Sequence, residues 1–309
     1  MSLSIGVDIS KEKLDICYPN KFCQIDNTET AIRSHFSNAP KESRVVEATG
    51  KHHRLLHKIL SEIGVGVMVI NPYQSRYFAR SMNIICKTDK VDAKVLRLYA
   101  ERMDFKPTAC LRKSEEELKE LHRYLDDLKT TRKGFIARQN DTEGVINGSL
   151  GSLVDHVDKE IKKIEKALEE TAKRDPILNH KLELLLTIPG VGMTTGISLL
   201  SYLNEIGTLS KRAVAALSGL APMNNDSGTM KGKRSIRRGR HDVRSHLYMP
   251  VLGAATRHNK TLKVFYERLV KSGKPKKVAL TACMRKIIVW ANAMLTTNSA
   301  WNEASPSCS

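Results

Sequence analysis

The sequence predicts an α/β N-terminal domain, a coiled-coil-like helical hairpin and a mostly helical C-terminal domain, in that order along 309 residues. Three strand-like apolar runs, followed by alternating helix and strand patterns, indicate a mixed sheet with helices on its faces. The periodicity then becomes that of long helices rich in glutamate, lysine and leucine, and further helical patterns return near the C-terminus. The predicted boundaries are 1–110 for the first domain, 111–181 for the hairpin, 182–298 for the basic C-terminal domain and 299–309 for a polar tail.

Short apolar runs bounded by turn residues define the elements of the N-terminal domain. The predicted strands cover residues 3–9, 14–18, 22–25, 44–48 and 65–70, and the predicted helices cover residues 29–36 and about 52–63. Asn27 or Thr28 can cap the first of these helices. Asn71-Pro72 closes the last strand. Thr88 is a candidate N-cap for a further helix, because apolar residues follow it at helical spacing.

Two long helices are expected between Ser114 and about His180, with an interruption near residues 144–151. Their apolar seams consist of Leu118, Leu121, Leu125 and Leu128 on one helix and Ile161, Ile164 and Leu168 on the other. Such a hairpin serves as a spacer or an oligomerisation element, and it carries no evident chemistry.

Four acidic residues near the N-terminus occupy places where acids are uncommon. Asp8 and Glu47 each lie near the end of a predicted buried strand, while Asp89 and Asp92 share one face of a predicted helix. Strand-end carboxylates that meet such a helix would repel one another without a cation, and two Mg²⁺ ions would make a phosphodiester-cutting site there. The alternative is that Asp8 caps a turn, Glu47 faces solvent and the aspartate pair lies on a solvated surface.

The positive charge is concentrated in the last third of the chain. The whole chain carries a net charge of +18, and the segment 211–286 holds 19 lysines and arginines against three acids, a local net of +16. This asymmetry favours a polyanionic partner, of which phosphate backbones are the commonest. Aromatic residues make up only 5% of the chain, too few for a platform that stacks single-stranded bases.

Cysteine and hydropathy patterns restrict the class of protein. The six cysteines include no Cys-x-x-Cys pair, so they indicate reduced thiols, and no structural zinc site is predicted; the finger-like spacing of His53/His57 and His241/His246 carries no weight without such a pair. The sequence has no run of 18 uncharged apolar residues and no signal segment at its N-terminus, so we expect a cytoplasmic, nucleoid-associated protein that does not contact membrane.

Two segments of the C-terminal domain suggest contacts with nucleic acid. Thr187-Ile-Pro-Gly-Val-Gly separates two predicted helices and resembles a helix-hairpin-helix turn, in which Gly190 and Gly192 would present backbone N–H groups to a phosphate, although any tight turn between helices has this pattern. Residues 219–240 are predicted to be a loop that holds Ser227. The cations expected to bind nucleic acid there are Lys231, Lys233, Arg234, Arg237, Arg238, Arg240 and, just beyond the loop, Arg244.

Several motifs resemble those of the DEDD insertion-sequence transposases. They are Gly6-Val-Asp-Ile-Ser, Val46-Glu-Ala-Thr-Gly, Lys87-Thr-Asp-x-x-Asp-Ala, Thr187-Ile-Pro-Gly-Val-Gly, Gly219-Leu-Ala-Pro, Asp226-Ser-Gly and Arg244-x-x-Leu-Tyr. The resemblance implies a ribonuclease H-like (RuvC-like) N-terminal fold in which Asp8, Glu47, Asp89 and Asp92 bind Mg²⁺ or Mn²⁺. It also implies that Ser227 attacks DNA. Its further implications are double-stranded donor and target DNA, a structured guide RNA and a homo-oligomer, dimer or tetramer.

The sequence therefore predicts a DNA transposase or recombinase that cuts and rejoins strands. An exposed serine needs an activating partner or metal and nearby cations to hold the scissile phosphate, and the basic segment supplies the cations. Two alternatives stay open at this point. One is a junction-resolving metal nuclease in which water attacks, and the other is a non-catalytic nucleic-acid-binding protein whose acids are structural.

Overall fold

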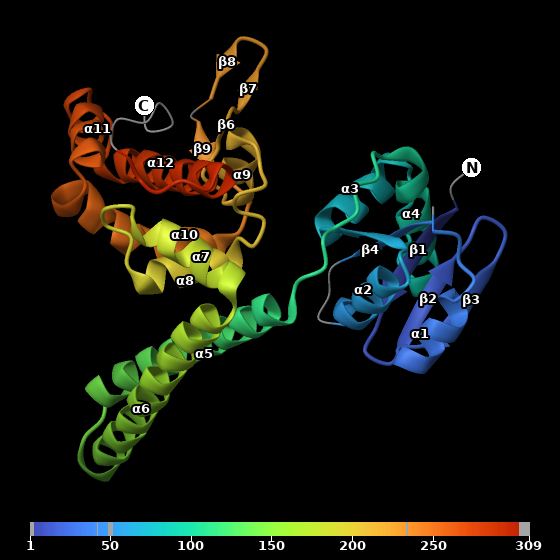
Figure 1. Cartoon of the computed structure of the whole chain (residues 1–309), viewed down its shortest axis with the longest axis horizontal. Coiled ribbons are helices and arrows are strands. Elements are labelled where there is room, and N and C mark those ends of the chain that lie inside the picture. Colours follow the sequence, from blue (N-terminus) through green and yellow to red (C-terminus); the bar gives the residue numbers. More distant parts are fainter. Residues whose placement is uncertain (1–2, 42, 49–51, 233, 303–309) are drawn as a thin grey trace. The chain divides into compact units, whose positions relative to one another are not determined.

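The computed structural model describes residues 3–41, 43–48, 52–232 and 234–302, without the side chains of residues 47, 48 and 231. The chain divides into two compact units, Met1–Leu111 and Arg112–Ser309. Figure 1 shows the strands and helices of both units. Each unit has its own apolar core.

The N-terminal unit is built on one five-stranded mixed sheet. Its strands are β1 (Ser4–Ile9), β2 (Lys13–Cys17), β3 (Phe22–Asp26), β4 (Arg44–Ala48) and β5 (Gly66–Ile70). They lie in the order β3-β2-β1-β4-β5, with antiparallel pairing among β1, β2 and β3 and parallel pairing of β4 with both β1 and β5. This is the ribonuclease H-like arrangement that the sequence predicts.

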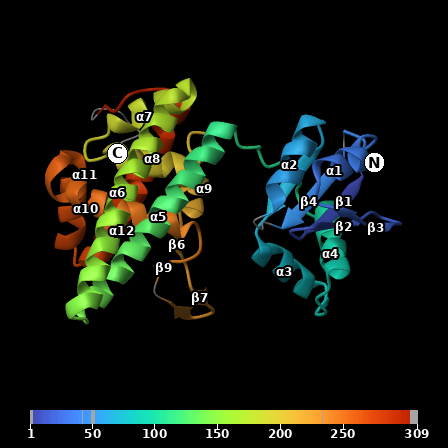
Figure 2. The same cartoon turned by 90° about the horizontal axis from the view of Figure 1, so that it is seen from below.

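Helices cover both faces of this sheet. They are α1 (Glu29–Phe36), α2 (His53–Glu62), α3 (Pro72–Ser81) and α4 (Asp89–Arg102). Figure 2 shows α1 and α2 on one side of the sheet and α3 and α4 on the other. Because successive strand residues face opposite sides, Val45 packs with the α1/α2 core while its neighbour Val46 packs with α4.

Helix α3 is an element that the sequence does not predict. Asn71-Pro72 indicates a turn that closes the strand, but the same dipeptide suits the start of a helix. The Asn71 side chain accepts a hydrogen bond from the Tyr73 N–H, and Pro72 occupies the first helical position, where no N–H is needed. A strand-ending signal and a helix-starting signal therefore coincide at residues 71 and 72.

The C-terminal unit begins with the helical hairpin of α5 (Lys113–Asn140) and α6 (Gly144–Arg174). The seam residues predicted from the sequence lie in or against one apolar core. The break between the helices falls at residues 141–143, slightly before the predicted position, and Gly148 and Gly151 lie inside α6. The Asn147 side-chain amide donates to the carbonyls of Gln139 and Thr142, both at 2.9 Å, which satisfies carbonyl groups at the end of α5 and closes the turn early.

The remaining helices of this unit surround a second part of the same core. They are α7 (Pro176–Leu186), α8 (Met193–Tyr202), α9 (Lys211–Leu217), α10 (His241–Gly253), the π-helical turn η1 (Ala254–His258), α11 (Lys260–Lys271) and α12 (Lys276–Thr297). Helix α12 is long and apolar enough to span a membrane by length and composition, but 56% of its most apolar window is buried inside the unit. It is therefore the central core helix, with Trp290 1% exposed.

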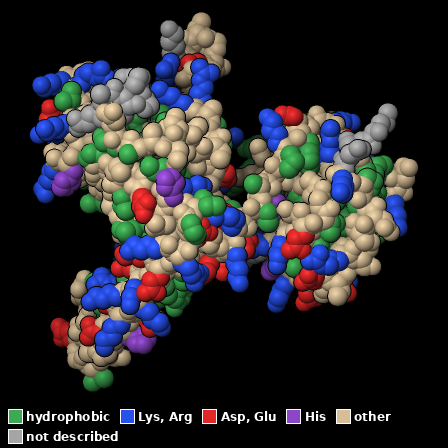
Figure 3. Space-filling model, viewed as in Figure 1, with side chains coloured by type: hydrophobic (Ala, Val, Ile, Leu, Met, Phe, Trp, Pro, Cys, Tyr) green, Lys and Arg blue, Asp and Glu red, His purple; other side chains and the backbone are tan. Residues whose placement is uncertain are grey.

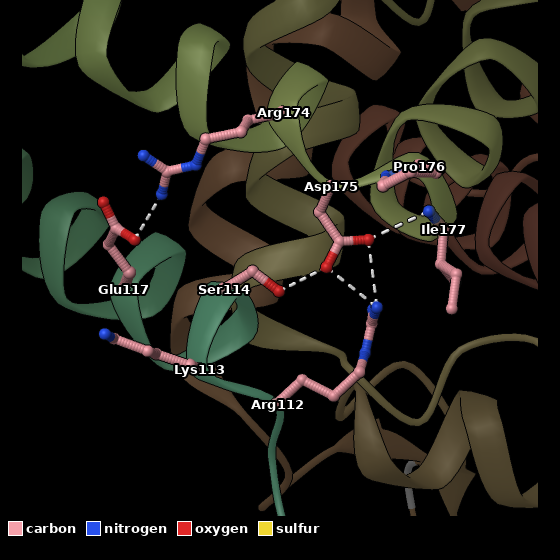
Figure 4. A pocket seen from close by; sticks show the side chains of 8 residues that line it. All are labelled: Arg112, Lys113, Ser114, Glu117, Arg174, Asp175, Pro176 and Ile177. Atoms are coloured by element: carbon pink, nitrogen blue, oxygen red, sulfur yellow. Dashed lines mark hydrogen bonds and ion pairs between the residues drawn. The ribbon is translucent and has the colours of Figure 1, made fainter.

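An open pocket of about 930 Å³ lies where α6 gives way to α7, at the base of the hairpin (Figure 4). Asp175 is its central residue. The Asp175 carboxylate accepts hydrogen bonds from Arg112 at 2.8 and 3.0 Å and from the Ser114 hydroxyl, and it caps α7 through the N–H groups of Ile177 and Leu178. This one carboxylate thus joins the start of α5 to the start of α7.

Replacing Asp175 by alanine is expected to destabilise the unit by about 1–3 kcal/mol, since it removes a helix cap and leaves Arg112 without that partner. Burial opposes ionisation, but hydrogen bonds from Ser114 and the Leu178 N–H, together with Arg112, lower the pKa of Asp175 to about 2. Its contribution is therefore complete above the ordinary value of 3.8 and is lost as the pH falls through about 2. Chemical denaturation at pH 7 measures the loss, and Asp158→Ala, at an exposed ion pair of the hairpin, is the control with little expected change.

Candidate active site

Asp8, Asp89 and Asp92 lie near one another where β1 meets the first turn of α4, close enough for the charges of Asp89 and Asp92 to raise the pKa of Asp8, but their carboxylate oxygens do not all lie within 4.8 Å of one another. Asp8 lies in β1, two residues beyond Gly6 and hence on the same face of the sheet. Helix α4 crosses that face directly over Gly6, where a Cβ atom would lie 2.0 Å from the carbonyl oxygen of Ala93. Thr88 caps the helix by accepting a hydrogen bond from the Val91 N–H at 3.2 Å. Asp89 and Asp92, both in the first turn, are thereby held beside Asp8.

Burial and mutual repulsion make this cluster costly in the absence of a cation. Burial raises the pKa of Asp8 to about 6, and the negative charges of Asp92, Asp89 and Asp15 add to that rise. Burial likewise raises the pKa of Asp92, although Lys87 and Arg76 oppose the effect. A site that gathers carboxylate oxygens and raises the pKa of two of them is chemically suited to a hard divalent cation.

Asp15 is an acid near this site that sequence reasoning missed. It lies in β2 with its Cα opposite that of Asp8 in the antiparallel register, and it is 6% exposed. The Gln24 amide donates to its Oδ1 at 2.9 Å. In the sequence, Asp15 stands inside the predicted strand 14–18. Its position in that strand does not distinguish it from a polar residue on the solvent-exposed face of a half-buried strand.

Glu47 is placed here by its backbone alone. It belongs to β4, and its Cα is in register with Val7, the residue before Asp8, in the parallel ladder. Its side chain lies outside the described part of the structure. The strand pairing thus brings two of the predicted site positions to neighbouring strands, while the role of the Glu47 carboxylate stays a prediction.

Gly6→Ala is expected to destabilise the N-terminal unit by about 3 kcal/mol or more and to abolish activity, because the new methyl group collides with the backbone of α4. Thermal unfolding measures the first effect and a strand-cleavage assay the second. Gly134→Ala is the matched control. Gly134 is exposed in α5 with nothing near its would-be Cβ, so there the same change should stabilise by up to about 1 kcal/mol. Equal effects of the two substitutions would contradict this account of the helix–strand contact.

Ser227 lies on a projecting arm of the C-terminal unit (Figure 1). The predicted loop is in fact two short antiparallel ladders, β6 (Pro222–Met223) with β9 (Ser235–Ile236) and β7 (Asp226–Ser227) with β8 (Met230–Lys231). The tip turns at Gly228, which has a φ of +54°. Ser227 is exposed. Asp226 accepts from the Gly232 N–H at 3.2 Å, and adjacent strand residues face opposite ways, so Asp226 is not placed as a base for Ser227.

The cations predicted around Ser227 fall into two groups. Arg234, Arg237 and Arg238 are exposed, whereas Arg240 makes two bonds of 2.6 Å to Glu205 and donates to the Tyr202 carbonyl. Arg244 donates to the Arg238 carbonyl at 2.6 Å and fills the space beside Gly219. Lys233 and the side chain of Lys231 lie outside the described residues. Figure 3 shows Lys and Arg side chains gathered at the foot of the arm and over α11.

The glycine turn between α7 and α8 has the predicted helix boundaries. Gly190 has a φ of +94° and packs so closely on Ala254 that a Cβ would lie 2.4 Å from the Ala254 methyl group. Gly192 is exposed and precedes α8 directly. The requirement for glycine at position 190 is therefore explained by backbone conformation and packing, and the exposed N-terminus of α8 is the part that is free to meet a phosphate.

Comparison with known proteins identifies relatives over nearly the whole chain. A transposase family model of the DEDD type matches residues 5–142, and the "Transposase IS116/IS110/IS902 family" model matches residues 182–267. The "Pilin gene-inverting protein" of Moraxella bovis is 28% identical, with 95% of this chain and 96% of that protein covered. The protein of the same name from Moraxella lacunata is 27% identical over the same shares. Both family domains are present, in order along the chain, and the fold agrees with them. The chain therefore belongs to the IS110 family of transposases, enzymes that transfer DNA strands by exchanging phosphodiester bonds.

Proposed function

We propose that this transposase cuts and rejoins double-stranded DNA with Ser227 as nucleophile and with Asp8, Glu47, Asp89 and Asp92 as ligands of Mg²⁺ or Mn²⁺. The observation that supports the proposal is the grouping of half-buried Asp8 and Asp92 with exposed Asp89, in which the negative charges of both helix residues raise the pKa of Asp8. Ions held there would supply Lewis-acid stabilisation of charge on the reacting phosphate. Membership of a strand-transfer family supports a catalytic role for these acids rather than a purely structural one.

Ser227 is proposed to form a covalent link to DNA. Its Oγ attacks phosphorus, so that an Oγ–P bond forms as a P–O bond of the DNA backbone breaks, and the proton of the hydroxyl passes to the leaving DNA oxygen. Attack by a DNA hydroxyl group on the phosphoserine ester then reseals a strand and returns the proton to Ser227. The number of phosphodiester-type bonds is conserved, so no nucleotide cofactor is needed. The exposed position at the tip of the arm supports this role, since a duplex can reach it.

The proposed partners follow from the positive charge of the C-terminal segment and from the relatives of the chain. Both named relatives are gene-inverting proteins, and we propose that inversion or transposition between two double-stranded sites is the outcome here as well. A structured guide RNA fits the basic C-terminal segment and the resemblance to RNA-guided members of the family. We also propose a homo-oligomer that acts on DNA in the cytoplasm. The carboxylates and Ser227 belong to different units of the chain, so two subunits can each supply one half of a site.

The decisive experiment is a strand-exchange assay with and without Mg²⁺, on DNA that carries the ends of the element, in the presence of RNA transcribed from its flanks. A covalent protein–DNA adduct that depends on Ser227 and on the metal is the expected result. Metal-dependent nicking without any adduct would instead identify the junction-resolving nuclease, in which water is the nucleophile.

Affinity for nucleic acid is expected to depend steeply on salt, falling by orders of magnitude between about 50 and 200 mM if six or more phosphates are neutralised. The double change Arg234→Ala and Arg237→Ala should weaken binding to every sequence alike and reduce the slope of log K against log salt by up to about 2. Fluorescence anisotropy titrations on two unrelated duplexes measure both effects. The control is Arg33→Ala, whose guanidinium is already neutralised by Glu29 and Glu62. An unchanged slope in the double variant would remove these two arginines from the interface.

A further inference from the structure

Three side chains of the C-terminal unit form a second possible metal site. It is distant in sequence from the proposed active site and differs from it chemically, because two of its three ligands are histidines. His122 and Asp126 occupy adjacent turns of α5, and His246 comes from α10. One ligand atom from each of the three lies within 4.8 Å of the others. Among the described residues, this set alone has three such donors in that range. It sits where the base of the hairpin packs against the C-terminal helices.

His122 is the residue that calls for a ligand. Its side chain is 2% exposed, yet its Nδ1 atom has no hydrogen-bond partner. The nearest oxygen of Asp126 is 3.6 Å away, which is too long for a hydrogen bond. Buried polar atoms are nearly always partnered in native structures, so an unpaired nitrogen aimed at a carboxylate indicates an absent ion or proton between them.

The ring of His246 is oriented as a metal-binding histidine is. Its Nδ1 lies 2.7 Å from the carbonyl oxygen of Asp242, to which only an N–H can donate. The other nitrogen, Nε2, then directs a lone pair at Asp126 Oδ1, 2.9 Å away. Two lone pairs at that distance repel, so a proton or a cation must lie between the atoms. A proton on His246 would satisfy this pair alone and would leave His122 Nδ1 unpartnered, whereas one ion satisfies all three side chains.

Donor chemistry and spacing select the kind of ion. Tetrahedral zinc with bonds of about 2.0–2.1 Å needs donors about 3.3 Å apart. His246 Nε2 lies 2.9 Å from Asp126 Oδ1, His122 Nδ1 lies 3.6 Å from Asp126 Oδ2, and one donor atom from each of the three side chains lies within 4.8 Å of the other two. Two imidazoles and one carboxylate suit zinc and its neighbours in the first transition row, while Mg²⁺ prefers oxygen donors alone. Tyr202 donates to Asp126 Oδ2 at 2.5 Å, which orients the carboxylate from outside the donor set.

We propose that His122, Asp126 and His246 bind one zinc-type transition-metal ion, with water in the fourth position. The ion joins α5 to α10 and so fixes the hairpin on the C-terminal helices. It is a structural ion, chemically distinct from the Mg²⁺ or Mn²⁺ proposed for the acidic site of the other unit. The inference does not depend on the proposed function.

The test is a Co²⁺ titration of the full-length protein, produced without a polyhistidine tag and stripped of metal, in excess Mg²⁺ to occupy the acidic site. Wild type should bind one equivalent with the visible spectrum of four-coordinate Co²⁺, and Zn²⁺ should displace it. His122→Ala and His246→Gln should each weaken binding by at least about 10-fold, as lost ligands do. His156→Ala, an exposed histidine on α6, should behave as wild type.

Thermal unfolding provides a second readout that does not depend on the spectrum. Saturating Zn²⁺ should raise the Tm of wild type and of His156→Ala by about 5 °C or more, and should leave the Tm of His246→Gln unchanged. Circular dichroism establishes that the variant is folded, and Asp126→Asn takes its place if it is not. The proposal is overturned if wild type binds no stoichiometric Co²⁺, or if the His122 and His246 variants bind it as wild type does. A proton shared by His246 and Asp126 is then the occupant.

Discussion

Replacement of Ser227 by alanine is expected to reduce strand cleavage by at least about 10⁴-fold and to remove the covalent protein–DNA adduct, because alanine has no oxygen to form the ester. Ser227→Cys should keep slight activity, since a thiol can attack phosphorus but suits a hard metal less well. Denaturing gel electrophoresis of labelled DNA after quenching measures adduct and cleavage together. Thr229→Ala removes another exposed hydroxyl from the same turn and should leave both intact.

Metal-dependent nicking that survives Ser227→Ala would contradict this prediction and favour water as the nucleophile. Mixing the Ser227→Ala protein with an Asp8→Asn protein addresses the origin of the two halves of the site. Restored activity in the mixture would mean that different subunits supply them. Absence of rescue, with both proteins folded and associated, would mean that one chain supplies both.

Asp8→Asn is expected to lower metal-dependent strand transfer by at least about 10³-fold, equivalent to about 4 kcal/mol of transition-state stabilisation. The side chain keeps its shape but loses the charge that a divalent ion needs. The Tm of the metal-free protein should not fall, because the change removes one charge from a cluster that repels itself. That pairing of lost activity with retained stability separates a metal ligand from a structural acid.

Asp104→Asn is the control for this change, since Asp104 is an exposed acid of the same unit that pairs with Lys106. It should alter neither quantity. Nucleic-acid affinity should be largely unaffected by Asp8→Asn. A marked drop in stability of the metal-free Asp8→Asn protein would show that the carboxylate has a structural role, and would contradict the assignment.

The sequence predicted the strands and most helices because their apolar residues recur with the period of the element. It misplaced features governed by local hydrogen bonds. Asn71-Pro72 serves equally to end a strand and to begin a helix, and the hairpin turn is set by the side chain of Asn147 rather than by the glycines after it. Periodicity carries no information about either choice.

The candidate site was only partly predictable for a related reason. Asp8, Asp89 and Asp92 could be singled out because each stands at the start or end of an element. Asp15 could not, since its importance comes from the register of β2 against β1. Arg240 resembles its neighbours in sequence, yet only the structure shows its guanidinium held by Glu205. The His122–His246 contact joins helices more than a hundred residues apart, and no spacing rule reaches that far.

The construction of the arm that bears Ser227 has a consequence for how the protein can change. Its ladders are only two residue pairs long, and Met223, Met230 and Ile236 are 38%, 62% and 37% exposed. The arm therefore has almost no apolar core, and substitutions there scarcely alter the free energy of folding. Natural selection on these residues therefore acts through the molecules that the arm contacts rather than through the stability of the fold. New DNA-contacting residues can accordingly be tried there without loss of the fold, which makes the arm the part of the molecule best suited to evolve or to be engineered towards new targets.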